Sequence, residues 1–205
     1  RRWKALPLPT ADVLLPAPAT LGGEPAVDGL PIPREPALPP EVPFPPSEAE
    51  AQRRLHAFTA DERPEIYGYA QGRDRLDWEG TSRLSPYLRF GLISGRQAVV
   101  GALQARQAAP DPAGRDGADI WLNELIWREF YQAILDRFPH VAEGSFRPEL
   151  SDVAWLPDRV SFEAWCQGRT GYPVVDAAIR QLVQTGWMHN RARMIAASFL
   201  VKDLL

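Results

Sequence analysis

The stretch Asp119–Phe138, DIWLNELIWREFYQAILDRF, carries the clearest helical pattern in this chain of 205 residues. Its apolar residues recur at steps of three and four, the spacing of one helical face, and a proline follows its last residue. The stripe that we expect to face the core consists of Leu122, Leu125, Ile126, Ala133 and Ile134. The stretch therefore predicts one long helix that packs along one side.

A second face of the same stretch combines aromatic rings with charges. Its members are Trp121, Glu124, Trp127, Arg128 and Tyr131, again three or four residues apart. One interpretation is a half-exposed helix with a Glu124–Arg128 ion pair. The other is a flat-walled pocket, in which Trp127 stacks on a planar ring. There Glu124 would accept hydrogen bonds from ring N–H groups, or donate one if burial raises its pKa.

Helices are also expected on both sides of this stretch. Ser47 and Glu50 have the spacing of a capping box, and Pro173 and Gly186 have the positions of a helix start and a helix end. The predicted helices cover 47–59, 85–91, 94–107, 161–168 and 173–186, with a last one from about residue 189. Loops are predicted over 63–84, with short helical turns, and over 111–119. No run alternates clearly at period two, so we expect an all-α fold.

Composition excludes several classes of protein. The net charge of −3 argues against a globally basic nucleic-acid binder, so any contact with DNA needs a local patch. The single cysteine, Cys166, excludes an internal disulfide. His56, His140 and His189 are too scattered for a metal site, and none is expected. No stretch is typical of a signal peptide or a membrane span.

Residues 1–46 hold more than half of the 21 prolines and favour extended polyproline II over helix or central strand. We expect this segment to be an interdomain linker lying over a surface. Trp3, Leu14, Leu15 and Phe44 could attach it there. Helical character begins at Ser47, which we take as the start of a second region, 47–205.

Two polar clusters flank the long helix in sequence. In GTSRLSPYL, residues 80–88, three hydroxyl side chains precede a helix start, which is typical either of a phosphate cradle or of an ordinary N-cap. In WMHNRARM, residues 187–194, Asn190, Arg193 and Met194 share a helical face. That pattern indicates either contacts to base edges and phosphates, or capping by Asn190 with solvated arginines.

Four motifs in order, EGTSRLSPYLRFG, WLNELIWREFY, TGYPVVDAAIRQL and GWMHNRARMIAASFLVKDLL, resemble DNA photolyases for cyclobutane pyrimidine dimers, within the photolyase/cryptochrome family. The resemblance covers Ser47 to Leu205. It implies a partial helical FAD-binding domain, with an α/β antenna domain before the linker and the rest of the flavin site after residue 205. Residues 1–205 alone are then expected to bind FAD weakly or not at all.

The resemblance also implies roles for individual residues. Those expected to hold FAD are Tyr69, Thr81, Ser82, Arg83, Leu84, Ser85, Trp121 and Arg193. Those expected to meet the dimer are Glu124, Trp127, Asn190 and Met194. Those expected to engage the DNA strand are Arg73, Arg128 and Arg191, together with Glu124, Trp127 and Asn190. Trp155 is expected to be the outermost tryptophan of an electron-transfer chain, and Trp187 to be core.

The implied activity is light-driven repair of pyrimidine dimers by electron transfer from reduced FAD. A folate or deazaflavin antenna, a monomeric state, UV-damaged DNA as partner, no membrane and a cytoplasmic location complete the expectation. The alternatives are a cryptochrome, which signals without repair, and an inactive helical module. A (6-4) photolyase is less favoured because that branch tends to have His where Asn190 stands.

Overall fold

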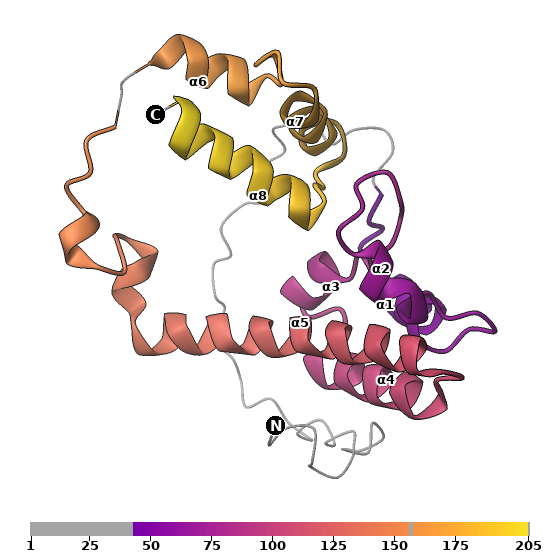
Figure 1. Cartoon of the computed structure of the whole chain (residues 1–205). Coiled ribbons are helices and arrows are strands. Elements are labelled where there is room, and N and C mark those ends of the chain that lie inside the picture. The colour runs from indigo at the N-terminus through magenta and orange to yellow at the C-terminus, as the bar shows by residue number, and fades with distance from the viewer. Residues whose placement is uncertain (1–42, 156–157, 205) are drawn as a thin grey trace, which may run out of the picture.

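The computed structural model describes residues 43–155 and 158–204, and within these ranges it contains helices and no strand (Figure 1). The all-α prediction is confirmed. Most of the predicted linker, with Trp3, Leu14 and Leu15, lies outside the described residues. Phe44, which is described, packs at the edge of the main core, its ring 6.2 Å from that of Tyr87.

The first group of helices runs from α1 to α5. Its elements are α1 (Glu48–Thr59), η2 (Glu65–Gly68), α2 (Tyr69–Gly72), α3 (Ser85–Arg89), α4 (Gly95–Ala108) and α5 (Pro112–Arg137). Phe58 of α1 lies at the centre of their shared core, with its ring 5.0 Å from Trp121 of α5 and 5.9 Å from Tyr69 of α2. This core holds the first half of α5 in place.

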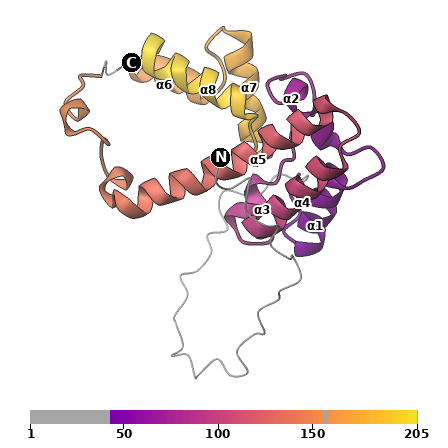
Figure 2. The same cartoon turned by 60° about the horizontal axis from the view of Figure 1, so that its bottom comes forward.

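The second group contains α6 (Arg159–Cys166), α7 (Pro173–Thr185), α8 (Asn190–Phe199) and a π-helical turn, η5 (Leu200–Leu204). Its core forms where Val175 and Ile179 of α7 meet Ala192 and Ala196 of α8. A connection with two short turns, η3 (Pro139–Ala142) and η4 (Pro148–Leu150), leads to it from α5. Figures 1 and 2 show the start of α8 beside the α2 region of the first group.

The long helix begins earlier than predicted. Residues 111–119 were predicted as a loop, and this prediction is wrong since α5 starts at Pro112. The Asp111 side chain caps the helix by accepting a hydrogen bond of 2.7 Å from the Gly114 N–H. Gly117 is a packing residue, because a Cβ there would lie 2.3 Å from the carbonyl oxygen of Ile66.

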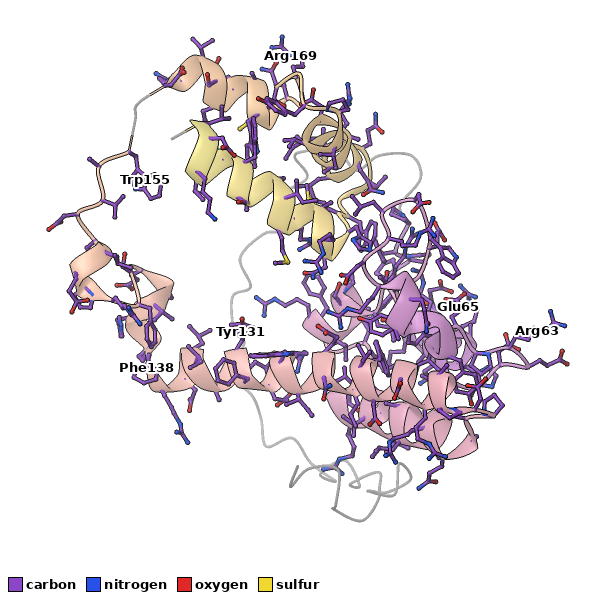
Figure 3. All side chains as sticks on the ribbon, viewed as in Figure 1. Arg63, Glu65, Tyr131, Phe138, Trp155 and Arg169 are labelled. Atoms are coloured by element: carbon purple, nitrogen blue, oxygen red, sulfur yellow. The ribbon has the colours of Figure 1, made fainter. Side chains whose placement is uncertain are left out.

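The second half of α5 is more exposed than its pattern predicts. Leu122 and Leu125 are buried as expected, but Ala133 is exposed and Ile134 only half-buried, so the predicted stripe is wrong at its end. The main core reaches along α5 only as far as Ile126. Exposed rings, among them Tyr131 and Phe138 in Figure 3, continue along this half of the helix.

Local capping explains several helix boundaries, with one correction to the predicted caps. The Ser47 hydroxyl accepts a hydrogen bond from the Glu50 N–H, as predicted. The Glu50 carboxylate accepts from Arg53 and Arg54 instead of from the Ser47 N–H, so only one of the two hydrogen bonds of the predicted capping box forms. Those guanidinium groups, Arg53 first, lower the pKa of Glu50 to about 2. A complete box forms instead at Ser94. Gly186 ends α7 in the left-handed conformation, with φ of 70°, as predicted.

Asp176 fixes the turn before α7, in the motif TGYPVVD. Asp176 is only 7% exposed, and its carboxylate accepts hydrogen bonds from the N–H and hydroxyl of Thr170, both 2.7 Å, and from the N–H of Gly171 at 3.0 Å. Since an asparagine cannot accept at both positions of its amide, Asp176→Asn is expected to lower the melting temperature by several degrees at neutral pH.

The pH dependence of this effect has a definite sign. The pKa of Asp176 lies below its ordinary value of 3.8, and the largest cause is the hydrogen bond from the Thr170 side chain. A carboxylate of this kind stabilises the fold above its unfolded pKa and loses that contribution as the pH falls through the folded pKa. Circular dichroism melts should show a constant difference between variant and wild type down to about pH 4, and a shrinking one below it. A difference that persists unchanged at low pH would contradict this role.

Candidate functional site

A cavity of 680 Å³ lies between the two groups of helices. Its walls come from α2, the 81–85 segment, α5 and the start of α8. Its volume falls in the range of roughly 300–1,000 Å³ that is typical of small-molecule sites. The predicted site residues that line it are Tyr69, Arg73, Thr81, Ser82, Arg83, Leu84, Ser85, Trp121, Glu124, Arg128, Asn190 and Arg193. Segments more than 100 residues apart in sequence thus contribute to one cavity.

The inner wall of the cavity is aromatic. Trp121 is 4% exposed and Tyr69 8% exposed, and both rings pack against Phe58 behind them. Burial raises the pKa of Tyr69 to about 12, so its hydroxyl stays protonated at neutral pH. The Arg73 guanidinium lies 5.6 Å from the centre of the Tyr69 ring. This wall is a rigid apolar surface with a cation at its edge.

The 81–85 segment supplies hydroxyl groups and a constrained arginine. Arg83 has φ of 49°, a left-handed conformation that is costly for a residue with a side chain. Its Nη2 donates to Glu79 at 2.6 Å, its guanidinium lies 4.6 Å from the centre of the Trp187 ring, and its buried Nε has no hydrogen-bond partner. An unpaired buried donor beside free hydroxyls is a natural place for an anionic group.

Two glycines place this segment. The backbones of Gly72 and Gly80 lie against each other, so closely that a Cβ on Gly80 would lie 2.7 Å from the carbonyl carbon of Gly72. The chain therefore leaves α2, forms a loop of seven residues, 73–79, and returns against the end of the same helix. This close approach brings Thr81 and Ser82 next to Arg73 at the cavity wall. The helix that follows, α3, has no side-chain N-cap, so the ordinary-cap interpretation of GTSRLSPYL is wrong.

Glu124 projects from the middle of α5 and is paired with Arg73. The Arg73 Nη1 donates to a Glu124 carboxylate oxygen at 2.6 Å. The predicted alternative, a Glu124–Arg128 pair, is wrong, because Arg128 donates to Glu129 at 2.7 Å and to the carbonyl oxygen of Leu88 at 3.4 Å. Glu124 thus accepts a hydrogen bond from a neighbour in the same wall.

The start of α8 forms the opposite wall. His189, and not Asn190, is its N-cap, since His189 Nδ1 accepts from the Arg191 N–H at 3.1 Å. Burial lowers the pKa of His189, which keeps Nδ1 free to accept. Asn190 is then released from capping and lines the cavity, while Arg193 donates to the carbonyl oxygen of Met188 at 3.0 Å.

Four predicted site residues lie outside the cavity lining. Trp127 is 51% exposed and stacks on Tyr131, with ring centres 6.1 Å apart. Arg191 and Met194 lie together at the exposed start of α8, with Nη1 and Sδ 3.8 Å apart. Trp155 lies on the connection between α5 and α6 and is exposed (Figure 3). The first three lie on α5 and α8, the helices that contribute lining residues, whereas Trp155 lies on neither.

Two residues that the sequence did not mark as functional also contribute. Trp187, predicted as core, is half-buried and lines the cavity with its ring under Arg83, so that prediction is wrong. Asp74 pairs with Arg191 at 2.6 Å across 117 positions of sequence. Neither contact has a periodic signature. The signal for Trp187 was its position next to the polar cluster at residues 189–193.

The part of the chain that the structure describes has no group of three or more His, Cys, Asp or Glu side chains arranged to hold a metal ion. Among the same residues, no helix is both long and apolar enough to span a membrane.

Comparisons with known proteins agree on one family. A family model described as the FAD binding domain of DNA photolyase matches residues 121–205. A deoxyribodipyrimidine photo-lyase of Vibrio cholerae is 50% identical over 145 residues, covering 69% of this chain and 30% of that protein. The crystal structure of a class III photolyase from Agrobacterium tumefaciens superposes with a TM-score of 0.72 at 38% identity, over 78% of this chain and 32% of that one.

A cryptochrome structure from Synechocystis sp. matches nearly as well, with a TM-score of 0.71 at 29% identity, over 80% of this chain and 33% of that one. The chain belongs to the photolyase/cryptochrome family, and the two relatives at 50% and 38% identity are photolyases. It spans about a third of the length of these relatives.

Proposed function

We propose that the gene product containing this chain is a light-driven DNA repair enzyme that splits cyclobutane pyrimidine dimers and carries FAD. The observation that carries the proposal is the shared cavity. It brings Trp121, Tyr69 and the 81–85 segment, which suit a flavin nucleotide, next to Glu124 and Asn190, which suit a pyrimidine pair. The relatives named deoxyribodipyrimidine photo-lyase support the same activity.

The residues present fit FAD. Thr81, Ser82 and Ser85 offer hydroxyl donors, and the unpaired Arg83 Nε offers a charged donor, as the two phosphates require. Trp121 would close the inner side of the site and exclude water. Arg193, fixed by the Met188 carbonyl, would place a positive charge beside the ring system. When bound and reduced, the flavin supplies the light-driven electron for repair.

The residues of α5 and α8 would receive the dimer. Photolyases are a standard example of enzymes that take a base out of the stack into a pocket with aromatic walls. Glu124 and Asn190 would hydrogen-bond the two bases, while the exposed side chains of Trp127 and Met194 would pack against them. Glu124 would change partner from Arg73 to the bases, and when protonated it would donate to a base carbonyl whose negative charge grows during repair.

Three arginines would hold the DNA strand. Arg73 and Arg128 line the cavity and Arg191 follows Asn190 of its lining, so the three would meet the phosphates of one strand by exchanging their present carboxylate partners. In the same proposal, Trp155 is the outermost tryptophan of an electron-transfer chain. A monomer acting on DNA in the cytoplasm, with a folate or deazaflavin antenna elsewhere in the gene product, is part of the same proposal.

The repair assay separates the alternatives. The full gene product, reduced and loaded with FAD, is mixed with dimer-containing DNA under blue light, and loss of dimers is measured against a dark control. We expect light-dependent loss. The similarity to a cryptochrome structure makes signalling without repair the second candidate, and bound flavin without dimer loss would support it. A protein that binds no flavin would contradict both.

A further inference from the structure

One exposed ion pair ties the first group of helices to the second. Arg191 of α8 donates to Asp74 Oδ1 through Nη2 at 2.6 Å and through Nε at 3.2 Å. Among the described residues, no other ion pair joins residues 43–137 to residues 159–204. The pair lies beside the cavity, because Arg73 and Asn190, the sequence neighbours of its two members, both line it.

The geometry of the Asp74–Arg191 pair allows Arg191 to exchange the Asp74 carboxylate for another anion. Asp74 and Arg191 have side chains that are 53% and 39% exposed, and ion pairs of this exposure contribute little to stability. The edge of the Arg191 guanidinium, Nε and Nη2, is engaged by a single oxygen. The same edge suits two oxygens of a phosphate group. A DNA phosphate could thus replace Asp74 without a change in the arginine's orientation.

Asp74 also stands within reach of a second arginine. Arg73 Nε lies 3.9 Å from Asp74 Oδ1, while Arg73 Nη1 is paired with Glu124. Positive and negative groups therefore alternate in a row along this edge, in the order Glu124, Arg73, Asp74 and Arg191. Each arginine that the proposed function assigns to DNA is occupied by a carboxylate of the protein itself.

We propose that Asp74 competes with a DNA phosphate for Arg191 and thereby weakens DNA binding beside the cavity. This inference rests on the proposed function only in taking DNA as the ligand. It assigns to Asp74 a positioning role: it holds Arg191 in place without DNA and gives it up when a phosphate arrives. The released Asp74 carboxylate then takes up a cation from solution. This uptake offsets the counterion that leaves the phosphate, so contact between Arg191 and the phosphate releases no net ion in the wild-type protein.

Binding measurements in the dark test this competition. The full gene product, with flavin bound, is titrated with undamaged and dimer-containing duplexes from about 50 to 200 mM salt. Asp74→Asn should bind both duplexes about two- to fivefold more tightly, the factor that matches a weak exposed ion pair. Its plot of log affinity against log salt should steepen by about 0.9, the value for one additional net counterion released.

Controls separate this effect from charge and from folding. Asp77→Asn changes the charge equally in the same loop, but Asp77 is paired with Arg75, so we expect little change. Adding Arg191→Gln to Asp74→Asn should remove the gain. An unchanged affinity in Asp74→Asn, an equal gain in Asp77→Asn, or a gain that survives Arg191→Gln would each overturn the proposal. A lower melting temperature and lost flavin without tighter binding would instead make Asp74 a purely structural residue.

The two proposals fail in different ways. If the wild-type protein does not repair dimers but Asp74→Asn still binds DNA more tightly, the repair function is wrong and the competition stands. If wild type repairs dimers and the Asp74→Asn variant shows no gain, the competition alone is wrong.

Discussion

Replacing Glu124 by alanine in the full gene product should reduce light-dependent dimer repair roughly 100-fold, whereas glutamine should retain most of it. A hydrogen-bond donor aimed at a developing negative charge contributes about two to three orders of magnitude in rate. Glutamine keeps an N–H donor for a base carbonyl and an oxygen for the Arg73 guanidinium, which donates to Glu124 at 2.6 Å. Alanine removes both and leaves Arg73 without this partner.

The measurement should separate binding from chemistry. Repair is followed by single-turnover flashes at saturating DNA, and dimer affinity is measured in the dark. Because alanine frees Arg73, the affinity of Glu124→Ala for DNA need not fall while its repair does. Glu129→Ala is the matched control, since Glu129 lies on the same helix but outside the cavity lining. Equal losses of repair in Glu124→Gln and Glu124→Ala would contradict a donor role.

Local chemistry in the sequence predicted many of the helices. Pro173 and Gly186 bracket α7 because a proline fits the first turn and a glycine fits the left-handed residue after the last. The part of α5 from Asp119 to Ile126 followed its apolar spacing, since periodicity reports a face that is buried by its neighbours. In its second half the spacing continues, but the main core ends at Ile126 and the rings beyond it are exposed.

Contacts between distant segments were not predictable. The Arg73–Glu124 pair spans 51 positions and the Asp74–Arg191 pair spans 117, and neither leaves a periodic mark in the sequence. The capping box at Ser47 failed for a related reason, because two arginines one turn away compete for Glu50. Residue types that suit FAD and DNA were recognisable through family motifs. Their partners within the fold required the structure.

Gly117 of α5 shows that helix propensity alone does not predict the effect of a substitution on stability, and Gly117→Ala tests this. In an ordinary helix interior, Gly→Ala stabilises by about 1 kcal/mol. At Gly117 we expect the opposite sign, a loss of about 3 kcal/mol or more, since overpacking costs that much when the neighbour cannot move aside. A Cβ there would lie 2.3 Å from the Ile66 carbonyl oxygen and 2.9 Å from that of Tyr67, and both atoms belong to the backbone.

The damage should reach the cofactor site. Ile66 and Tyr67 belong to η2, which leads directly into α2 with Tyr69 and Arg73, so a displaced η2 would move two lining residues of the cavity. Urea unfolding and flavin content of the full gene product measure both effects. Gly95→Ala at the start of α4 is the control, because its Cβ would approach nothing closer than 3.8 Å and should leave stability nearly unchanged. Equal stability of the two variants would show that α5 and η2 do not pack as closely as their backbones indicate.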